Sequence, residues 1–394
     1  MSELSYLEKL LDGVEVEWLP LAKVCRLING RAYKQEELLS KGKYPVLRVG
    51  NFFTNQNWYY SDLELDQDKY CDNGDLLYAW SASFGPRIWH GGKSIYHYHI
   101  WKVVPDLNLI CKQFLYYLLQ WDTKALKDAH STGSTMMHIS KTTIEKRLVP
   151  IPCPDNPEKS LAIQSEIVRI LDKFTALTAE LTAELTAELN MRKKQYNYYR
   201  DQLLSFKEGE VKWKTLGEIT EINTGQKPSE ILDKAATFDY INAGTSRSGY
   251  TTMSNCDGDT VTTPSRGQGG IGFVGYQKTP FWLGPLCYKI KSLNNEILIN
   301  KFLFYTLQSR NRILLSLKKE GGVPAVNKID LAKLIIPLPS LDEQKRIVSL
   351  LDKFDTLTNS ITEGLPREIE LRQKQYEYYR DLLFSFPKPE TVSN

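Results

Sequence analysis

The sequence of 394 residues lacks the features that mark membrane, secreted and disulfide-rich proteins. It contains no run that approaches the roughly 18 apolar residues of a membrane-spanning helix. Its first 17 residues are acidic and amphipathic, unlike a signal peptide. Its six cysteines are scattered and include no Cys-x-x-Cys pair, which disfavours a disulfide framework and a zinc site. We therefore expect a cytoplasmic protein with reduced cysteines and no membrane contact.

Motifs for covalent chemistry are also missing. Residues 267–272 match Gly-x-Gly-x-x-Gly, but the aromatic, turn-rich residues after them do not predict the helix that a dinucleotide-binding turn requires. Residues 92–94 read Gly-Lys-Ser, but Arg87 stands where a phosphate-binding loop needs its first glycine. His97 and His99 alternate on one predicted strand without an evident third ligand, which favours structural histidines over a metal site. The sequence therefore predicts neither a catalytic residue nor a metal ligand.

A large charge of one sign is absent too, since the net charge is only +3 at pH 7. The positive excess is local. Residues 14–153 carry 17 Lys and Arg against 14 Asp and Glu, and residues 211–340 carry 16 against 10. Together with 22 tyrosines and 8 tryptophans, this distribution permits a polyanionic partner, through release of counterions and stacking on bases.

What the sequence does contain is an internal repeat. Residues 164–206 return as residues 344–386 at a constant offset of 180, without a gap. Upstream of each copy stand a proline pair and a similar apolar segment, KQFLYYLLQ at 112–120 and NKFLFYTLQ at 300–308. The pattern predicts a duplicated chain whose N-terminus completes a repeat begun at its C-terminus, which is a circular arrangement. Looser matches pair Trp18 and Gly30 with Trp213 and Gly225.

Both copies of the repeat predict a long amphipathic helix. Apolar residues recur at steps of three and four from Ile167 to Leu189, and at the same steps from Ile347 to Ile369, which forms one stripe on a helix. A stripe on a helix of about 40 residues, or about 60 Å, needs a partner of similar length, and the other copy is the simplest one. We therefore expect a long antiparallel two-helix coiled coil between two globular domains.

The two predicted helices differ at one place. The first copy carries the unit TAEL three times in residues 178–189, and its period of four moves the leucine stripe around the helix by about 40° per unit. The second copy has Gly364 and Pro366 at the matching place, which predicts a kink or break near Gly364. The tandem units indicate that helix length matters, and the alternative is that they are simply good helix formers.

The rest of each half predicts short strands, turns and one helix. We expect a helix around Lys112 to Leu126 in the first half and one from Ile299 to Leu317 in the second, and a single strand at 93–104. The predicted fold class is α+β: two mixed α/β domains separated by the coiled coil, with an internal pseudo-twofold, circular repeat. The expected boundaries are an N-terminal helical segment at 1–13, a first domain at 14–153, a central long helix at 154–209, a second domain at 210–340, a C-terminal long helix at 341–386 and a tail at 387–394.

These motifs together carry a family resemblance. Each copy begins with Gln-x-x-Ile-Val and continues to Leu-Asp-Lys-Phe, and each ends with KQY-x-YYRD. With the TAEL units and two dissimilar domains, the chain resembles the specificity subunit of type I restriction–modification enzymes, most closely the class with TAEL-type repeats (type IC). The resemblance covers essentially the whole chain. It implies two target-recognition domains, each reading one half of a bipartite DNA site, and paired helices that set the spacing and dock methyltransferase subunits.

The resemblance also implies the partners. One specificity subunit would join two modification subunits as an adenine-N6 methyltransferase, and two restriction subunits for ATP-dependent cleavage of double-stranded DNA. The chain itself would be non-catalytic and hold no cofactor, because S-adenosylmethionine, ATP and magnesium would belong to partner subunits. Two other functions stay open on the residues: a stand-alone sequence-specific repressor, which would bind DNA without partners, and a coiled-coil adaptor without DNA preference.

The TAEL units suggest how spacing is set. One unit advances a helix by about 6 Å and 40°, while one base pair advances DNA by about 3.4 Å and about 35°. Because the rotations nearly match, we predict that deleting one unit shortens the gap between half-sites by one base pair. The spacer residues are Thr178, Leu181, Leu185 and Leu189.

DNA contacts are expected from side-chain donors in loops, which reach base edges and phosphates, although solvated surface charge explains any single one equally well. The expected DNA-binding residues are Arg31, Tyr33, Lys34, Arg87, Trp89, His90 and Lys93 in the first domain, and Gln226, Lys227, Ser246, Arg247, Arg266, Gln268 and Lys278 in the second. An aromatic and basic docking face for two equal partners, or alternatively a cap of the helix pair, is expected at Arg192, Lys193, Lys194, Tyr196, Tyr199 and Arg200, and at Arg372, Lys374, Tyr376, Tyr379 and Arg380.

Overall fold

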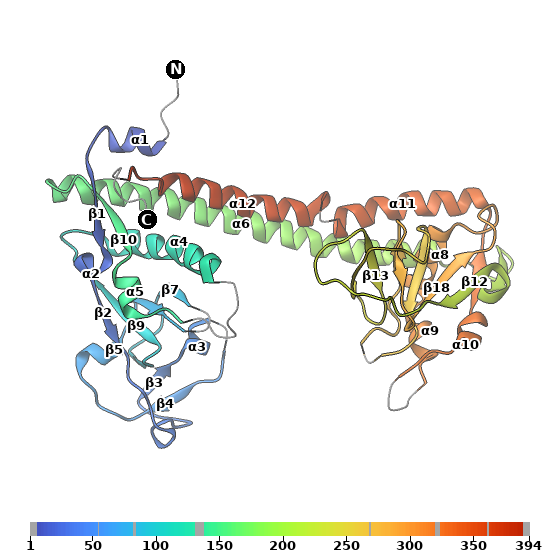
Figure 1. Cartoon of the computed structure of the whole chain (residues 1–394), viewed down its shortest axis with the longest axis horizontal. Coiled ribbons are helices and arrows are strands. Elements are labelled where there is room, and N and C mark those ends of the chain that lie inside the picture. The colour runs from blue at the N-terminus through green and yellow to red at the C-terminus, as the bar shows by residue number, and fades with distance from the viewer. Residues whose placement is uncertain are drawn as a thin grey trace. The chain divides into compact units, whose positions relative to one another are not determined.

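The computed structural model of the chain describes residues 6–53, 55–81, 84–130, 138–267, 269–319, 324–360 and 362–388 (Figure 1). The chain divides into two compact units. The first unit comprises Met1–Leu181 and Arg372–Asn394, and the second comprises Thr182–Leu371. Each unit combines helices with small sheets, which confirms the expected mixed helix and sheet fold.

The first unit is built on two four-stranded sheets and one strand pair. Its strands are β1 (Val16–Pro20), β2 (Cys25–Asn29), β3 (Tyr44–Leu47), β4 (Tyr59–Ser61), β5 (Tyr70–Cys71), β6 (Leu76–Ala79), β7 (Gly85–Ile88), β8 (Ser94–Tyr96), β9 (Ile100–Pro105) and β10 (Leu148–Pro152). One sheet has the order β2-β9-β6-β7 and is antiparallel throughout. The other has the order β4-β3-β8-β5, with β3 parallel to β8, and β1 pairs with β10.

The single strand expected at 93–104 is wrong. The segment forms two strands in different sheets, β8 and β9, and the chain turns between them. Pairing explains the break, because His97 donates its backbone N–H to Leu47 (2.9 Å) while Ile100 begins the antiparallel pairing in the other sheet. His97 and His99 therefore lie in a turn and do not alternate along a strand.

The first unit also contains short and long helices. They are α1 (Tyr6–Leu11), α2 (Leu21–Val24), α3 (Val49–Phe53), α4 (Lys112–His130), α5 (Lys141–Glu145), the 3-10 turns η1 (Gln35–Glu37) and η2 (Gln67–Lys69), and parts of α6 (Pro157–Leu203) and α12 (Gly364–Leu383). Figure 1 shows α4 between α6 and the strands. Phe114 of α4 is fully buried and contacts Phe384 and Phe386, with ring centroids 6.1 and 6.2 Å away. The end of the chain therefore completes the core that the N-terminal residues begin.

The second unit repeats this arrangement. Its strands are β11 (Lys212–Thr215), β12 (Thr220–Thr224), β13 (Phe238–Ile241), β14 (Gly249–Thr251), β15 (Thr260–Pro264), β16 (Gly275–Gln277), β17 (Trp282–Leu283), β18 (Cys287–Ser292) and β19 (Ile335–Leu338). The order β12-β18-β15-β16 matches that of β2-β9-β6-β7. The second sheet, β14-β13-β17, again contains one parallel pair, β13 with β17, and β11 pairs with β19.

The helix expected from Ile299 to Leu317 is broken. The second unit contains α7 (Leu216–Ile219), α8 (Asn300–Ser309), α9 (Asn311–Ser316), α10 (Lys328–Ala332) and α11 (Leu341–Asn359). Arg310 separates α8 from α9 with a non-helical backbone at φ −102° and ψ 21°. Its guanidinium donates to the carbonyl of Ile335 (3.2 Å) and lies 5.2 Å from the ring centroid of Trp213. These tertiary contacts, which periodicity does not report, hold the residue out of the helix.

The two repeated helical segments differ as expected. Helix α6 is continuous over 47 residues and includes all three TAEL units. The matching segment is divided into α11 and α12, and Gly364 begins α12 with a φ of +80°, so the predicted break is confirmed. Ile361 of the apolar stripe lies outside the described residues. Within the described part of the chain, no helix is both long and apolar enough to cross a lipid bilayer.

Candidate nucleic-acid interface

A buried glutamine attaches each sheet-bearing domain to its long helix. The Oε1 of Gln164 accepts the backbone N–H of Cys111 (2.9 Å), and its Nε2 donates to the carbonyl of Leu109 (2.9 Å). Gln344 makes the same pair of contacts in the second unit, to Ile299 N (2.9 Å) and Ile297 O (2.9 Å). Both side chains are fully buried. Each glutamine satisfies two backbone groups of the segment that precedes α4 or α8. It therefore fixes that segment against the long helix, α6 or α11.

A tyrosine–carboxylate contact accompanies each glutamine. The hydroxyl of Tyr117 donates to Asp172 (2.6 Å), and that of Tyr305 donates to Asp352 (2.5 Å). Burial, and then the hydrogen bond to the carboxylate, raise the pKa of both tyrosines. The hydroxyls therefore stay protonated at neutral pH, and each domain is held to its long helix at a second point.

A glycine at the end of the first sheet strand allows two chain segments to cross closely. A Cβ on Gly30 would lie 2.3 Å from the carbonyl oxygen of Tyr96, and one on Gly225 would lie 1.8 Å from that of Leu283. The next residue donates its backbone N–H across the crossing in each unit, Arg31 to Tyr96 (3.0 Å) and Gln226 to Leu283 (3.1 Å). The two crossings thus place two expected DNA-binding residues at matching points of similar frames.

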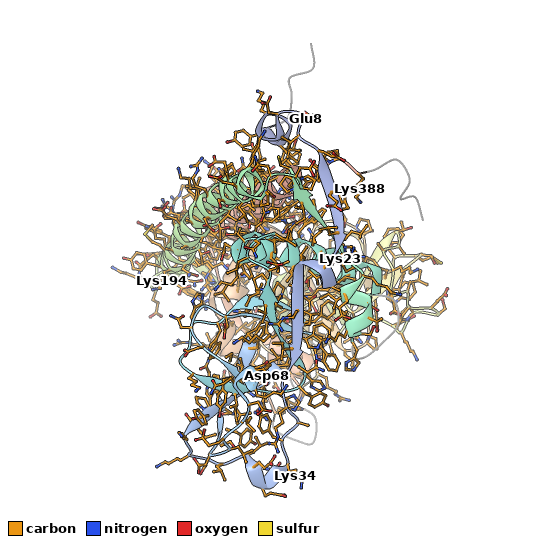
Figure 2. The ribbon with its side chains drawn as sticks, turned by 90° about the vertical axis from the view of Figure 1, so that its left-hand side faces the viewer. Glu8, Lys23, Lys34, Asp68, Lys194 and Lys388 are labelled. Atoms are coloured by element: carbon orange, nitrogen blue, oxygen red, sulfur yellow. The ribbon has the colours of Figure 1, made fainter. Side chains whose placement is uncertain are left out.

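Three of the first domain's candidates lie beside η1. The guanidinium of Arg31 is paired with Glu37 (2.7 and 3.0 Å), which lowers the pKa of the Glu37 carboxyl. It also lies 5.4 Å from the ring centroid of Tyr33, which is half-buried. Lys34 is exposed, and Figure 2 shows it at the tip of the unit, remote from Glu8 of α1.

The other four candidates fall into two groups. Arg87 lies over the ring of Phe53 (5.1 Å), and the indole of Trp89 donates to the carbonyl of Gly92 (3.0 Å). Lys93 instead lies over the ring of Tyr70 (4.3 Å), which belongs to the same apolar cluster as Tyr33. The structure therefore gathers Arg31, Tyr33 and Lys93 around one aromatic cluster, places Arg87 and Trp89 at a second, and leaves His90 exposed.

In the second domain, two loops that carry candidates lie side by side. A Cβ on Gly270 would lie 2.7 Å from the backbone nitrogen of Gly244, so the loop after Arg266 touches the loop that carries Ser246 and Arg247. Ser246 and Arg266 are exposed.

The remaining candidates of this domain lie on either side of those loops. Arg247 pairs with Asp239 (3.0 Å) and lies over the ring of Tyr250 (4.2 Å). Gln226 and Lys227 are exposed after β12. Lys278 follows β16 at the opposite end of the β15–β16 pair from Arg266, so the structure does not bring these two together. Gln268 lies outside the described residues.

Residue-by-residue reasoning missed a polar hollow in the first domain. It has a volume of about 340 Å³ and is lined by Arg48, Val49, Gly50, Asn55, His97 and His99. No group of three or more His, Cys, Asp and Glu side chains within the described ranges is placed to hold a metal ion. The usable signal was Arg48 directly after a strand, in a segment rich in asparagine and aromatic residues.

The expected docking face contains one buried residue. Tyr196 is only 5% exposed and donates its hydroxyl to Gln308 (2.8 Å), so it belongs to the core of the second unit and its placement on an exposed face is wrong. Its apolar ring is needed to fill the space between α6 and α8. Arg200 and Arg380 are also largely covered, each paired with the aspartate that follows it (2.8 and 2.9 Å).

The other docking candidates are more accessible. Tyr199 is 46% exposed and stacks on Phe354 (5.9 Å), and Tyr379 is 38% exposed and stacks on Phe174 (5.3 Å). Lys193, Lys194 and Lys374 are exposed, and Figure 2 labels Lys194 on the outer flank of α6. Arg192 pairs with Glu188 (2.6 Å), Arg372 donates to Gln375 (3.1 Å), and Tyr376 accepts from Thr175 (3.2 Å).

An apolar hollow of about 380 Å³ in the first unit is lined by Tyr6, Leu7, Ile170, Phe174, Tyr379, Leu382 and Leu383.

Comparisons with known proteins agree on one family. A family model described as the type I restriction modification DNA specificity domain matches residues 14–191 and again residues 208–371. The chain is 44% identical to the EcoR124I/EcoR124II specificity subunit of Escherichia coli, with 100% of both chains covered. It is 41% identical to the EcoprrI specificity subunit of Escherichia coli, over 92% of this chain and 93% of that protein.

A solved structure shares the fold. A chain from a study of complex assembly and conformational transition in a type I restriction–modification system superposes with a TM-score of 0.64. The match covers 94% of this chain and 97% of that one at 16% sequence identity.

Proposed function

The chain belongs to the type I restriction–modification DNA specificity family, and we propose that each of its two domains reads one half of a bipartite site in double-stranded DNA. It is the DNA-recognition subunit of such a system and is not itself the enzyme. The observation that carries the proposal is the pair of sheets with one strand order and one mode of attachment but different loops. Two domains with the same sheet and different loops are suited to recognise two different DNA sequences. We place the recognition domains at 14–153 and 210–340, as the sequence suggested.

We further propose that the helices form an antiparallel coiled coil within an internal pseudo-twofold, circular repeat. In the first unit Phe174 of α6 stacks on Tyr379 near the end of α12, and in the second Tyr199 near the end of α6 stacks on Phe354 of α11. Both contacts join an early residue of one segment to a late residue of the other, as antiparallel neighbours do. The indole of Trp18 donates to the carbonyl of Pro387 (2.8 Å), which ties the two chain ends into one unit.

We also propose that the TAEL units set the spacing between the two half-sites, and that the chain belongs to the TAEL-repeat class. The leucines of the run, Leu181, Leu185 and Leu189, are half-buried, and the division between the two units falls directly after Leu181. A continuous helix at this division makes its length a means of setting the interval between the readers, since each unit adds a fixed rise and rotation.

The accessible aromatic residues of the helices support docking of two modification subunits. The long helices of each unit present a stacked aromatic pair with a partly exposed tyrosine, Tyr379 or Tyr199, and tyrosine is enriched in protein interfaces. We propose that two restriction subunits join through that assembly in the cytoplasm. S-adenosylmethionine, ATP and magnesium then serve the partner subunits, and this chain supplies sequence recognition.

The test is co-expression of the chain with a type I modification subunit, followed by mapping of methylated adenines across a genome. The expected result is two short motifs that flank a gap of fixed length and unspecified sequence. Tight sequence-specific binding by the chain alone, with no methylation in the complex, would favour a repressor. An assembly without any DNA preference would favour a coiled-coil adaptor.

A further inference from the structure

The polar hollow of the first domain stands where two parallel strands end. Arg48 directly follows β3, and His97 directly follows β8. Val49 and Gly50 of α3, together with Asn55 and His99, supply the rest of the wall. Figure 1 shows α3 beside the strands of this unit. The carboxyl ends of parallel strands are a common place for ligand sites, because the chain leaves the sheet there and exposes side chains.

Arg48 in this hollow is paired with no carboxylate among the described residues. Its guanidinium lies 4.3 Å from the ring centroid of Tyr59, and its Nε is buried without a hydrogen bond. Among the described residues, no carboxylate forms an ion pair with it, whereas Arg31 in the same domain pairs with Glu37. A half-buried, unneutralised guanidinium is costly unless another group satisfies it. A ligand in the hollow can supply acceptors for this guanidinium.

Asn55 also presents donors. Its Oδ1 accepts the backbone N–H of Asn57 (2.8 Å), and its own N–H donates to the carbonyl of Gly50 (2.8 Å). Asn51 holds the same turn through its Nδ2, which donates to the carbonyls of Asn55 (3.0 Å) and Asn57 (2.7 Å). Because Oδ1 is engaged and the turn is fixed, the side-chain amide of Asn55 has its N–H groups left for an acceptor in the hollow.

His97 adds one more donor. Its Nδ1 accepts the backbone N–H of His99 (3.4 Å), which leaves the proton of the neutral ring on Nε2. Burial, and then His99 and Arg48, lower the pKa of His97 to about 4. The ring is therefore neutral at pH 7. The hollow thus combines the Arg48 cation with the neutral donors of Asn55 and His97, and His99 adds a second imidazole.

The matching junction of the second domain is closed. Ile241 at the end of β13 accepts the N–H of Gly284, as Leu47 accepts that of His97. Asn242 stands in the place of Arg48, and its Oδ1 is used internally, accepting the backbone N–H of Leu286 (2.9 Å). A Cβ on Gly284 would lie 2.5 Å from that oxygen. The same junction is filled by the protein in one domain and left open with donors in the other.

We infer that this hollow receives the major-groove edge of a guanine in the half-site read by the first domain, with Arg48 and Asn55 as specificity-determining residues. The inference rests on the proposed function. Guanine presents two acceptors, N7 and O6, in the major groove, and a planar guanidinium matches them with two parallel hydrogen bonds. A phosphate offers acceptors too, but it is negatively charged, and the neutral side chains of His97 and Asn55 supply no positive charge beyond that of Arg48. The uncharged edge of a base therefore suits the hollow better.

Two substitutions test the inference in the complete methyltransferase complex, with methylated adenines mapped as the readout. Arg48→Lys keeps the charge and loses the planar fork, so we expect discrimination at one guanine of the first half-site to fall roughly 5- to 150-fold. Asn55→Asp keeps the Oδ1 acceptor and removes the donors. It should shift the preference at that position toward cytosine, whose N4 amino group is a donor. The second half-site should not change in either variant, which also shows that the complex is assembled.

The controls separate the outcomes. Arg26→Lys alters an exposed arginine on β2, and Asn57→Asp adds the same charge two residues away in the same turn, so both should keep the wild-type motif. Uniform weakening of binding across all sequences by Arg48→Ala, with a salt dependence reduced by about one phosphate, would assign Arg48 to the backbone and overturn the inference. An unchanged motif in Arg48→Lys and Asn55→Asp would overturn it as well. If the wild-type complex yields no bipartite motif at all, the proposed function itself fails.

Discussion

The two domains of the molecule use one frame for different surfaces. Gln164 and Gln344 make the same two backbone contacts. The sheets β2-β9-β6-β7 and β12-β18-β15-β16 have the same strand order, and in each the first strand leads directly into a close chain crossing, at Gly30 or Gly225. The loops after β3 and β13 differ: the first continues into α3 beside an open hollow, whereas the second turns toward β14 and closes the junction with Asn242. The comparison shows that buried groups fix the shared sheet and its attachment to the long helix, whereas exposed loop residues can differ and so change the DNA sequence that each domain recognises.

The largest effect is expected from the helix that the two domains share. Deleting residues 182–185, one TAEL unit, should abolish modification at the original site and restore it at a site whose gap is one base pair shorter. A domain in the wrong place forfeits several base contacts worth about 1–3 kcal/mol each, so we expect a loss of at least about 100-fold at the original gap.

Methylation of a plasmid library with gaps of every length measures this. Glu184→Ala, which keeps the length of α6, is the control and should leave the gap unchanged. Altered half-sites in the deletion variant, with the same gap, would contradict the spacer proposal.

Removing a buried attachment should have the next largest effect. Gln164→Leu and Gln344→Leu each leave a buried backbone N–H and C=O unsatisfied, at about 1–3 kcal/mol for each group. We expect each variant to lose about 2–5 kcal/mol of unfolding free energy in its own unit, measured by chemical denaturation. Gln373→Leu, on an exposed part of α12, should change little. Unequal losses for Gln164 and Gln344 would break the equivalence of the two attachments.

The crossing glycines should show a smaller effect. Gly30→Ala and Gly225→Ala place a methyl group against a backbone carbonyl, and overpacking of this kind costs about 1–3 kcal/mol. Gly92→Ala is the control, because no atom lies within 4 Å of the added Cβ. Thermal unfolding should separate the two variants from the control, and tolerance of alanine at Gly225 but not Gly30 would show that the second crossing is looser.

The smallest expected difference between the domains is in how their folding stability depends on pH. The pKa of His97 is lowered to about 4 from its ordinary value of 6.5, so the unfolded chain binds the proton first as the pH falls. The stability from the neutral ring is complete above about pH 6.5 and is lost as the pH falls toward 4. All five histidines precede residue 139, so the second domain lacks this contribution.

Comparing the wild type with His97→Gln by denaturation at pH 7 and pH 4.5 measures that contribution. The variant should lose less stability on acidification. An identical loss in both proteins would show that His97 is not held neutral by the fold.

Local sequence patterns predicted the helices better than the surfaces. The apolar stripe from Ile167 to Leu189 and the pair Gly364 and Pro366 gave α6 and the break before α12, because periodicity and backbone preference act locally. Arg310 breaks the expected helix through contacts with Ile335 and Trp213 that lie far away in the sequence. Tyr196 was misplaced for the same reason, since its burial depends on α8.

The candidate DNA-facing residues show this limit most clearly. Choosing donors by residue type selected Arg31, which pairs with Glu37, and passed over Arg48, whose Nε makes no hydrogen bond among the described residues. Whether an arginine is neutralised depends on its neighbours in space. The hollow itself arises where the parallel strands β3 and β8 of one sheet end, and the pairing of these two strands, which are far apart in the sequence, is not reported by local spacing.

One exchange tests the central claim most directly. Residues 212–338 are replaced by the matching segment of the Escherichia coli relative that is 44% identical, and methylated adenines are mapped for the hybrid complex. If each domain reads its own half-site, the first half-motif and the gap length stay as in the wild type while the second half-motif becomes that of the relative. A hybrid that is assembled and active but changes both half-motifs together would contradict independent reading by two domains.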